Sequence, residues 1–130
     1  MPYSHAAGAY REREVLSASP PRLVVIVYDH VLTSLARAQQ AQRAGKEEAR
    51  LAALSTAREG IMELVVTIDA EKGGEIARQL QSLYTFFLTS LLDVGVRRDS
   101  RLLERVIGMI TELRDSFATV AADATRVSAA

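Results

Sequence analysis

The sequence predicts an all-α protein, an antiparallel up-down four-helix bundle preceded by a short N-terminal arm or helix. Apolar residues recur at steps of three and four through most of the chain, which places side chains on one face of a helix. All three prolines lie within the first 21 residues, so nothing beyond them forbids helix. No short alternating run bounded by turn residues occurs, so no strand is expected.

Two helices are expected in the first half of the chain. The first begins after Ser19, a residue suited to the N-cap, with Pro20 at its first position, and Gly45 is expected to end it. The second opens with Glu47–Glu48, acidic residues that favour a helix N-terminus, and is expected to run to Gly73–Gly74. Their apolar faces are Val24, Tyr28, Val31, Leu35 and Ala38 in the first, and Leu54, Ala57, Ile61, Leu64 and Ile68 in the second.

Two more helices are expected in the second half. One covers 74–94 and closes at Gly95, and Asp99 is expected to cap the start of the other. Gly60 and Gly108 fall inside helices, where each either lets two helices approach closely or costs about 1 kcal/mol relative to alanine. The apolar faces are Ile76, Leu80, Leu83, Phe87, Leu91 and Val94 in the third helix, and Leu103, Val106, Ile110, Leu113, Phe117 and Val120 in the fourth.

The chain is expected to form a single domain. Its 130 residues are enough to bury a real core, and helices of roughly 20 to 25 residues joined by short loops pack as antiparallel neighbours. We expect an N-terminal arm over 1–17, able to dock as a short helix, the bundle over 18–122 and a frayed tail over 123–130.

Composition argues against several classes of function. Sixteen basic residues balance sixteen acidic ones, so no net charge favours nucleic acid or an anionic membrane. The cluster from Arg97 to Arg105 is interrupted by acids and lacks aromatic residues for stacking on bases, so we expect a solvated face. No apolar run approaches the roughly 20 residues of a membrane span, and the N-terminus lacks the pattern of a secretory signal. We therefore expect neither nucleic-acid binding nor membrane insertion.

Nothing in the sequence predicts an enzyme. Cysteine is absent, which excludes thiolate chemistry. His5 and His30 lack the glutamate three residues earlier that a di-iron bundle uses, so we expect no metal site. The pair Gly73–Gly74 does not follow a strand and lacks the longer glycine pattern of a phosphate loop. We expect no catalytic residue and no cofactor.

The glycine pair is instead expected to form a structural corner. Gly73 would allow a positive φ, and Gly74 would let the next helix begin where a side chain would clash. Glu75 then lies in the first helical turn, where a negative charge is favourable.

Several short stretches together resemble a known family. They are Tyr10-Arg11, the ASP of 18–20, Tyr28-Asp29, the stretch IDAEKGGEIA over 68–77 followed by Leu80, Leu83 and Tyr84, then Arg98-Asp99 and Leu113-Arg114. In this order the chain resembles FliS, the bacterial flagellar secretion chaperones that bind flagellin, and the stretch around the glycines is the most specific mark. Val27 stands where the family usually has leucine, and Phe117 where tryptophan is common.

The resemblance implies a chaperone of the bacterial cytoplasm. Its client would be the C-terminal segment of flagellin, which is disordered in the free monomer. The chaperone would prevent premature polymerisation and deliver flagellin to the flagellar type III export apparatus. An export-gate protein would be a second partner and an anti-sigma factor a possible further client, and the free protein would be a monomer or a weak homodimer. The alternative is a self-associating helical adaptor that does not bind flagellin.

The sequence also predicts where a client would bind. The stretch 76–92 carries more apolar residues than a two-per-heptad seam requires, which predicts a groove for an amphipathic client helix. Tyr3 and Tyr10 are hypothesised to cover part of it when it is empty, the alternative being an ordinary disordered terminus. The expected client-binding residues are Leu23, Val27, Tyr28, Val31, Ile61, Leu64, Ile68, Ile76, Ala77, Leu80, Tyr84, Phe87 and Leu91.

Overall fold

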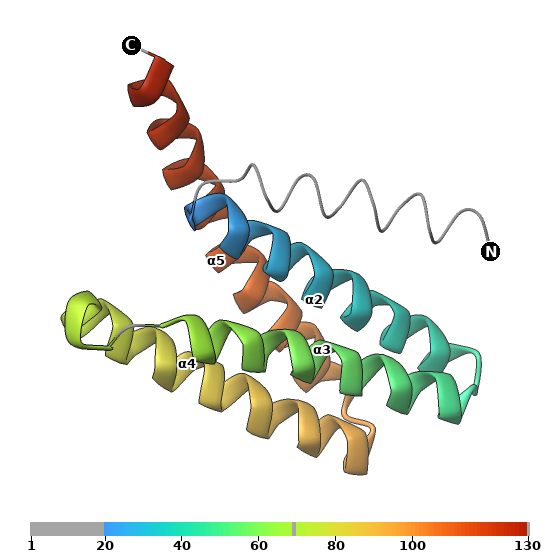
Figure 1. Ribbon diagram of the computed structural model, residues 1–130. Coiled ribbons are helices and arrows are strands. Elements are labelled where there is room, and N and C mark those ends of the chain that lie inside the picture. The colour runs from blue at the N-terminus through green and yellow to red at the C-terminus, as the bar shows by residue number, and fades with distance from the viewer. Residues whose placement is uncertain (1–19, 69, 130) are drawn as a thin grey trace.

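The structure is a computed structural model that describes residues 20–68 and 70–129. Helices α2 (Pro20–Arg43), α3 (Glu47–Thr67), α4 (Ala70–Arg97) and α5 (Ser100–Ala129) make up nearly all of this part, which contains no strand. Consecutive helices run antiparallel, and α2 and α4 each lie between α3 and α5 (Figure 1). The predicted four-helix bundle is confirmed, whereas the arm with Tyr3 and Tyr10 lies outside the described residues.

The core is built from the predicted apolar faces. Each helix contributes residues spaced three or four apart, so that its buried stripe faces the three other helices. Tyr28 of α2 reaches across the bundle to Tyr84 of α4, and their hydroxyls are 2.5 Å apart. The buried cluster comprises Tyr28, Val31, Leu35, Ala38, Leu54, Ala57, Ile61, Leu64, Tyr84, Phe87, Leu91, Val94, Leu103, Val106 and Ile110.

Two of the expected helix ends are confirmed. Gly45 has a φ of 68°. Its N–H donates to the Gln42 carbonyl, and the Lys46 N–H donates to the Ala41 carbonyl. These two bonds satisfy carbonyls at the end of α2 as a Schellman motif does. At the start of α5 the Asp99 carboxylate accepts a hydrogen bond from the Leu102 N–H at 3.1 Å, as an N-cap does.

The corner between α3 and α4 differs from the expectation. Helix α3 stops at Thr67, and the extended residue Ile68 breaks the chain direction, six residues before Gly74. A short helical turn follows, and the kink is at Gly74, with φ 57° and ψ −132°. The expected roles of the two glycines are therefore exchanged. Gly74 supplies the positive φ, and a Cβ on Gly73 would lie 2.5 Å from the Ala77 Cβ.

The prediction that Gly95 ends the third helix was wrong. Helix α4 continues to Arg97, and Arg98, with φ 56°, follows it. Gly95 lies inside the helix, and a Cβ there would make only an ordinary van der Waals contact with α3, 3.9 Å from Leu54 Cδ1. Helix α5 continues to Ala129, and the expected boundary between bundle and tail at residue 122 stays a prediction.

Gly60 and Gly108, which were expected to fall inside helices, have different surroundings. A Cβ on Gly60 would lie 2.6 Å from Val31 Cγ2, so this glycine allows α3 to approach α2 closely. A Cβ on Gly108 would meet nothing within 4 Å. Of the two alternatives left open by the sequence, close approach of two helices applies to Gly60, and a loss of stability relative to alanine applies to Gly108.

Candidate functional site

Most of the predicted client-binding residues lie in the core of this closed bundle. A partner cannot contact these side chains on the surface described here. Periodicity identifies the face that a helix turns inward, which is why the list is dominated by core residues. Tyr28, Val31, Ile61, Leu64, Ala77, Tyr84, Phe87 and Leu91 are buried, Leu23, Val27, Ile68 and Leu80 are half-buried, and Ile76 is exposed.

One predicted stripe passes from the core out to the surface. Ile76, Leu80, Leu83 and Phe87 follow one another on α4 at steps of four, three and four, so they share one side of the helix. Phe87 is fully buried, Leu83 and Leu80 are half-buried, and Ile76 is 70% exposed. We call these four residues the α4 stripe. Its N-terminal end is a core-type surface that the described helices leave largely uncovered.

A groove between α4 and α5 adjoins the α4 stripe. It has a volume of about 290 Å³. Helix α5 diverges from α4 towards the N-terminal end of α4, so the two helices separate beside the stripe (Figure 1). The groove is lined by Leu83, Phe87, Met109, Glu112, Leu113 and Ser116. Its walls are mainly apolar, with one acidic side chain. Of these six residues, only Phe87 was among the expected client-binding residues.

A group of aromatic side chains lies beneath this region. The Tyr28 ring is 5.6 Å from Phe117 and 6.4 Å from Tyr84, measured between ring centroids. Burial raises the pKa of both tyrosines, and their mutual hydrogen bond raises that of Tyr28 further. Both hydroxyls therefore stay neutral at physiological pH, and the group acts as packing rather than as an acid or base.

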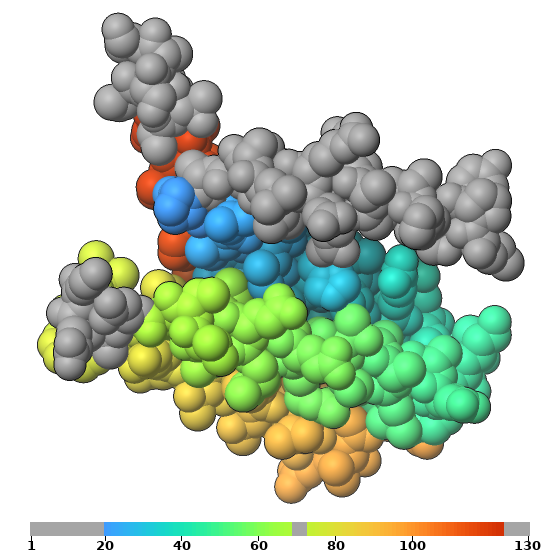
Figure 2. All heavy atoms as spheres, viewed as in Figure 1, coloured from blue at the N-terminus to red at the C-terminus, as the bar shows by residue number. Residues whose placement is uncertain are grey.

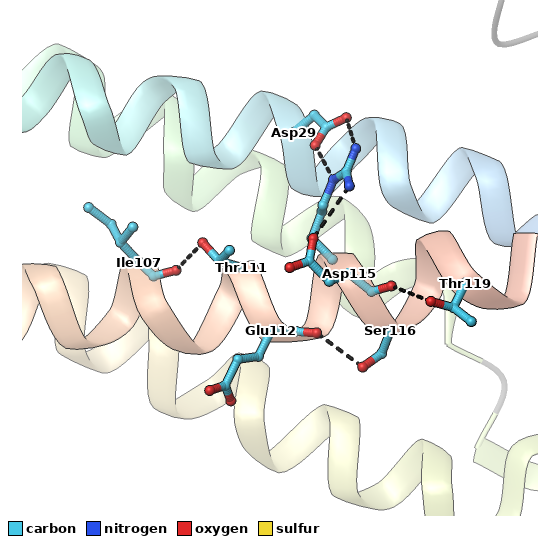
Figure 3. A network of polar contacts seen from close by, with 8 residues as sticks. Asp29, Ile107, Thr111, Glu112, Asp115, Ser116 and Thr119 are labelled. Carbon is cyan, nitrogen blue, oxygen red and sulfur yellow. Dashed lines mark hydrogen bonds and ion pairs between the residues drawn. The ribbon is translucent and has the colours of Figure 1, made fainter.

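Polar side chains near the groove are already engaged. Arg114 on α5 donates to Asp29 on α2 through Nε at 2.8 Å and also contacts Asp115 (Figure 3). Its pKa is raised, chiefly by the hydrogen bond to Asp29. Ser116 donates to the carbonyl of Glu112 on its own helix. The Asp29–Arg114 pair joins α2 to α5.

The opposite end of α4 is closed by a buried arginine. Arg50 of α3 is 1% exposed and donates to the carbonyls of Val94 and Gly95 in α4, at 3.2 and 2.9 Å. It also donates to both carboxylate oxygens of Glu47, which in turn pairs with Arg98. These contacts hold the C-terminal end of α4 against α3, whereas the α4 stripe lies towards the other end.

A second apolar surface lies on a face of α3 that the sequence analysis did not identify. Leu51, Met62 and Val66 are 46, 48 and 79% exposed. A hollow of about 650 Å³ borders the last two of these, and α3 is open to solvent between α2 and α4 (Figure 2). These residues lie off the predicted stripe of α3. They could have been found from the sequence by noting which apolar residues of this helix lie outside its inward stripe.

The structure provides no metal centre among the residues it describes. None of them form a group of three or more histidine, cysteine, aspartate or glutamate side chains able to hold an ion. Within the same part of the chain, no helix is both long enough and apolar enough to cross a membrane.

The sequence is similar to one family of flagellar proteins. Residues 3–124 match the family model described as Flagellar protein FliS. The chain is 35% identical to the flagellar secretion chaperone FliS of Salmonella typhimurium over 107 residues, which are 82% of this chain and 79% of that protein. It is 30% identical to the protein of the same name from Campylobacter jejuni over 115 residues, 88% of this chain and 90% of that one. The corresponding Bacillus subtilis protein is 26% identical over 109 residues, 84% and 80% of the two chains.

Proposed function

Because this chain belongs to the FliS family of flagellar secretion chaperones, we propose that it binds the C-terminal segment of flagellin as an amphipathic helix. The client lies along the α4 stripe and enters the groove between α4 and α5. The supporting observation is the gradient of exposure along the stripe, from buried Phe87 to Ile76 at 70%. A client helix with apolar residues at i, i+3, i+4 and i+7 continues the core over the uncovered part.

The energetics suit a chaperone that holds its client and later releases it. Burying about 1,000 Å² of apolar surface contributes on the order of 25 kcal/mol. Ordering a disordered client and fixing it in place offsets most of this gain. We expect a dissociation constant between nanomolar and micromolar, so release by competition at an export-gate protein needs no nucleotide.

The proposed place of action is the cytoplasm, before export. Covering the C-terminal segment there prevents flagellin from polymerising, and the complex then goes to the flagellar type III export apparatus. Apart from Phe87, the seven buried residues that we expected to contact the client stay packed in the core in this arrangement. They support the floor of the site.

Calorimetric titration tests the proposal. The chain is titrated with the C-terminal segment of flagellin from the same organism, and with the N-terminal segment as the control. We expect one-to-one binding of the C-terminal segment alone, with a large negative heat-capacity change from coupled folding and apolar burial. Binding of neither segment would favour the self-associating adaptor. The same titration with an anti-sigma factor tests the second client.

Substitutions at two exposed positions of α4 test where the client binds. Ile76→Asp places a charge on the α4 stripe, and Val96→Asp places one on α4 at a side chain that is 85% exposed. Both changes leave the core intact. We expect the first to weaken client binding about tenfold or more, since a buried unpaired charge costs over 1.4 kcal/mol, and the second to leave it unchanged. Equal affinities would place the client elsewhere.

A further inference from the structure

The α5 wall of the groove is a continuous helix face with a single charge. It consists of Met109, Glu112, Leu113 and Ser116, which follow at steps of three, one and three residues. At 100° per residue this spacing places all four on one side of α5. The wall opposite, on α4, is apolar. A client helix that enters the groove therefore lies beside the Glu112 carboxylate.

The described helices supply Glu112 with no cation. Its carboxylate forms no ion pair with any residue that the structure describes. Side chains three and four positions apart are neighbours on a helix surface. At those spacings from Glu112, α5 carries no basic residue but Gly108, Met109, Asp115 and Ser116. One of these neighbours is itself acidic, so the local sequence leaves the charge of Glu112 uncompensated.

The arginine nearest to Glu112 in the sequence is turned to the other side of α5. Arg114 donates to Asp29 of α2 through Nε at 2.8 Å. In Figure 3 the Glu112 side chain points away from this pair, on the opposite side of the α5 ribbon. Two residues of separation place two side chains about 200° apart around a helix. Arg114 therefore neutralises an acid of the bundle and leaves the groove with its negative charge.

We propose that Glu112 determines which client sequences bind in the groove, by pairing with a lysine or arginine at the edge of the client's apolar face. This inference rests on the proposed function. In the free chain Glu112 is exposed, whereas a client helix in the groove covers part of its carboxylate. A covered carboxylate without a partner is unfavourable. A basic side chain on the client removes that cost, so a segment that matches only the apolar pattern binds less well.

Charge variants at Glu112 test the inference. Calorimetric titration of the full chain with the C-terminal segment of flagellin gives the dissociation constant. Glu112→Gln keeps the shape of the side chain and removes its charge, and we expect binding about threefold to tenfold weaker. Glu112→Lys sets a like charge against the client and should weaken binding more than about tenfold. Melting temperatures should stay close to that of the unmodified chain, because an exposed side chain contributes little to stability.

Glu104 provides the matched control on the same helix. It is exposed and, like Glu112, has no ion-pair partner within the described part of the chain. It lies on the α2 side of α5, beside Gln39 and Gln42, and so away from the groove. Glu104→Gln and Glu104→Lys should leave the affinity for the flagellin segment unchanged. Losses of equal size at both positions would overturn the inference, because the overall charge of α5 would then attract the client.

Substitutions in the client identify the other half of the pair. Each lysine and arginine of the flagellin segment is changed in turn to glutamate and titrated against the unmodified chain and against Glu112→Lys. We expect one such change to weaken binding to the unmodified chain and to bring binding to Glu112→Lys within about threefold of the original value.

The outcomes separate this inference from the proposed function. If the unmodified chain binds the segment but the Glu112 variants bind it equally well, or no change in the client restores binding to Glu112→Lys, the pairing is refuted and the proposed function stands. If the unmodified chain does not bind the segment, the proposed function is refuted and the role of Glu112 with it.

Discussion

Arg50 illustrates how a buried charge can be stabilised by the end of a helix. Its guanidinium spans α3 and α4 and donates to Glu47 and to the carbonyls of Val94 and Gly95. Those carbonyls lie in the last turns of α4, where negative partial charge accumulates. The hydrogen bonds therefore offset the cost of removing the charge from water. Arg50 gives the Gly95 carbonyl a donor, and it adds a second donor to the Val94 carbonyl, which also accepts from the Arg98 N–H.

Removing this side chain should destabilise the bundle strongly. Arg50→Ala leaves buried carbonyls with fewer partners and a cavity, and we expect it to lower the free energy of unfolding by about 3 kcal/mol. Arg43→Ala, an exposed arginine at the end of α2, should cost less than about 0.5 kcal/mol. Urea unfolding of both variants makes the comparison. If both variants lost a similar free energy of unfolding, Arg50 would contribute no more to stability than an exposed arginine does.

Glu47 should make stability depend on pH. The hydrogen bond from Arg50 is the main reason that its pKa lies below the ordinary value of 4.5. A carboxylate with a lowered folded-state pKa contributes stability that is fully present above the unfolded-state pKa and lost as pH falls through the folded one. The loss caused by Glu47→Gln should therefore be largest near neutral pH and shrink below about pH 4.5.

The control for this pH effect is the neighbouring glutamate. Glu48 forms no ion pair with the described residues. Thermal unfolding of Glu47→Gln and Glu48→Gln is measured at several pH values from neutral to acid. A Glu47→Gln deficit that stays constant down the series would rule out the charge-assisted contact as its cause.

At the scale of helices, Gly60 and Gly108 offer a matched pair. Gly60→Ala forces a Cβ to within 2.6 Å of Val31 Cγ2, where α3 meets α2. We expect a loss of about 1 to 3 kcal/mol, the range for overpacking. Gly108→Ala fills open space on α5 and should gain about 1 kcal/mol of stability from helix propensity. Chemical denaturation should give shifts of opposite sign. A gain at both positions would show that α2 and α3 separate readily.

The kink at the start of α4 should be sensitive to any side chain. Gly74 has space around its Cβ position, but its φ of 57° with ψ −132° is a backbone conformation that other residues rarely adopt. Gly74→Val should therefore cost about 2 kcal/mol of stability or shift the kink and weaken client binding. Gly108→Val, at an open helical position, serves as the control and should be close to neutral. Normal melting and normal affinity in Gly74→Val would contradict the strain argument.

The presence of the four helices could be predicted from this sequence, whereas only some of their ends could be. A three-four spacing follows from the geometry of the helix, so most of each core stripe was identified correctly. Ile76 and Val120, at 70 and 52% exposed, are the exceptions. A glycine is ambiguous, because it can end a helix, as Gly45 does, or allow close packing within one, as Gly60 does. Only the position of Val31 on a different helix decides the second case. That information is not local in sequence.

The candidate site depends on the whole bundle, which explains why the sequence predicted it less well. Periodicity assigns Ile76 and Phe87 to one stripe, yet they differ from 70 to 0% exposed. The difference in exposure arises because α5 diverges from α4 and leaves Ile76 uncovered (Figure 1). The angle at which two helices cross is not encoded in the spacing of apolar residues along one of them. The exposed apolar residues of α3, Leu51, Met62 and Val66, were missed for a related reason. They lie off the inward stripe, and they are exposed because no other described helix covers that side of α3.

The bundle as a whole has one closed end and one open end, and this should appear in its dynamics. Arg50 holds the C-terminal end of α4, whereas the kink at Gly74 and the exposed part of the α4 stripe lie towards the other end. Local opening is easiest where few apolar contacts hold a segment. Backbone amides over 76–83 should therefore exchange with solvent about 100-fold faster than those over 91–97.

Hydrogen exchange followed by mass spectrometry measures this difference directly. Adding the C-terminal segment of flagellin should slow exchange over 76–83 and over the facing part of α5 around Met109 and Leu113, because the client completes the core there. The segment around Arg50 should change little, since its contacts are already made. Uniform protection along α4 in the free chain, or protection gained only at the Arg50 end, would contradict both the closed-end argument and the proposed position of the client.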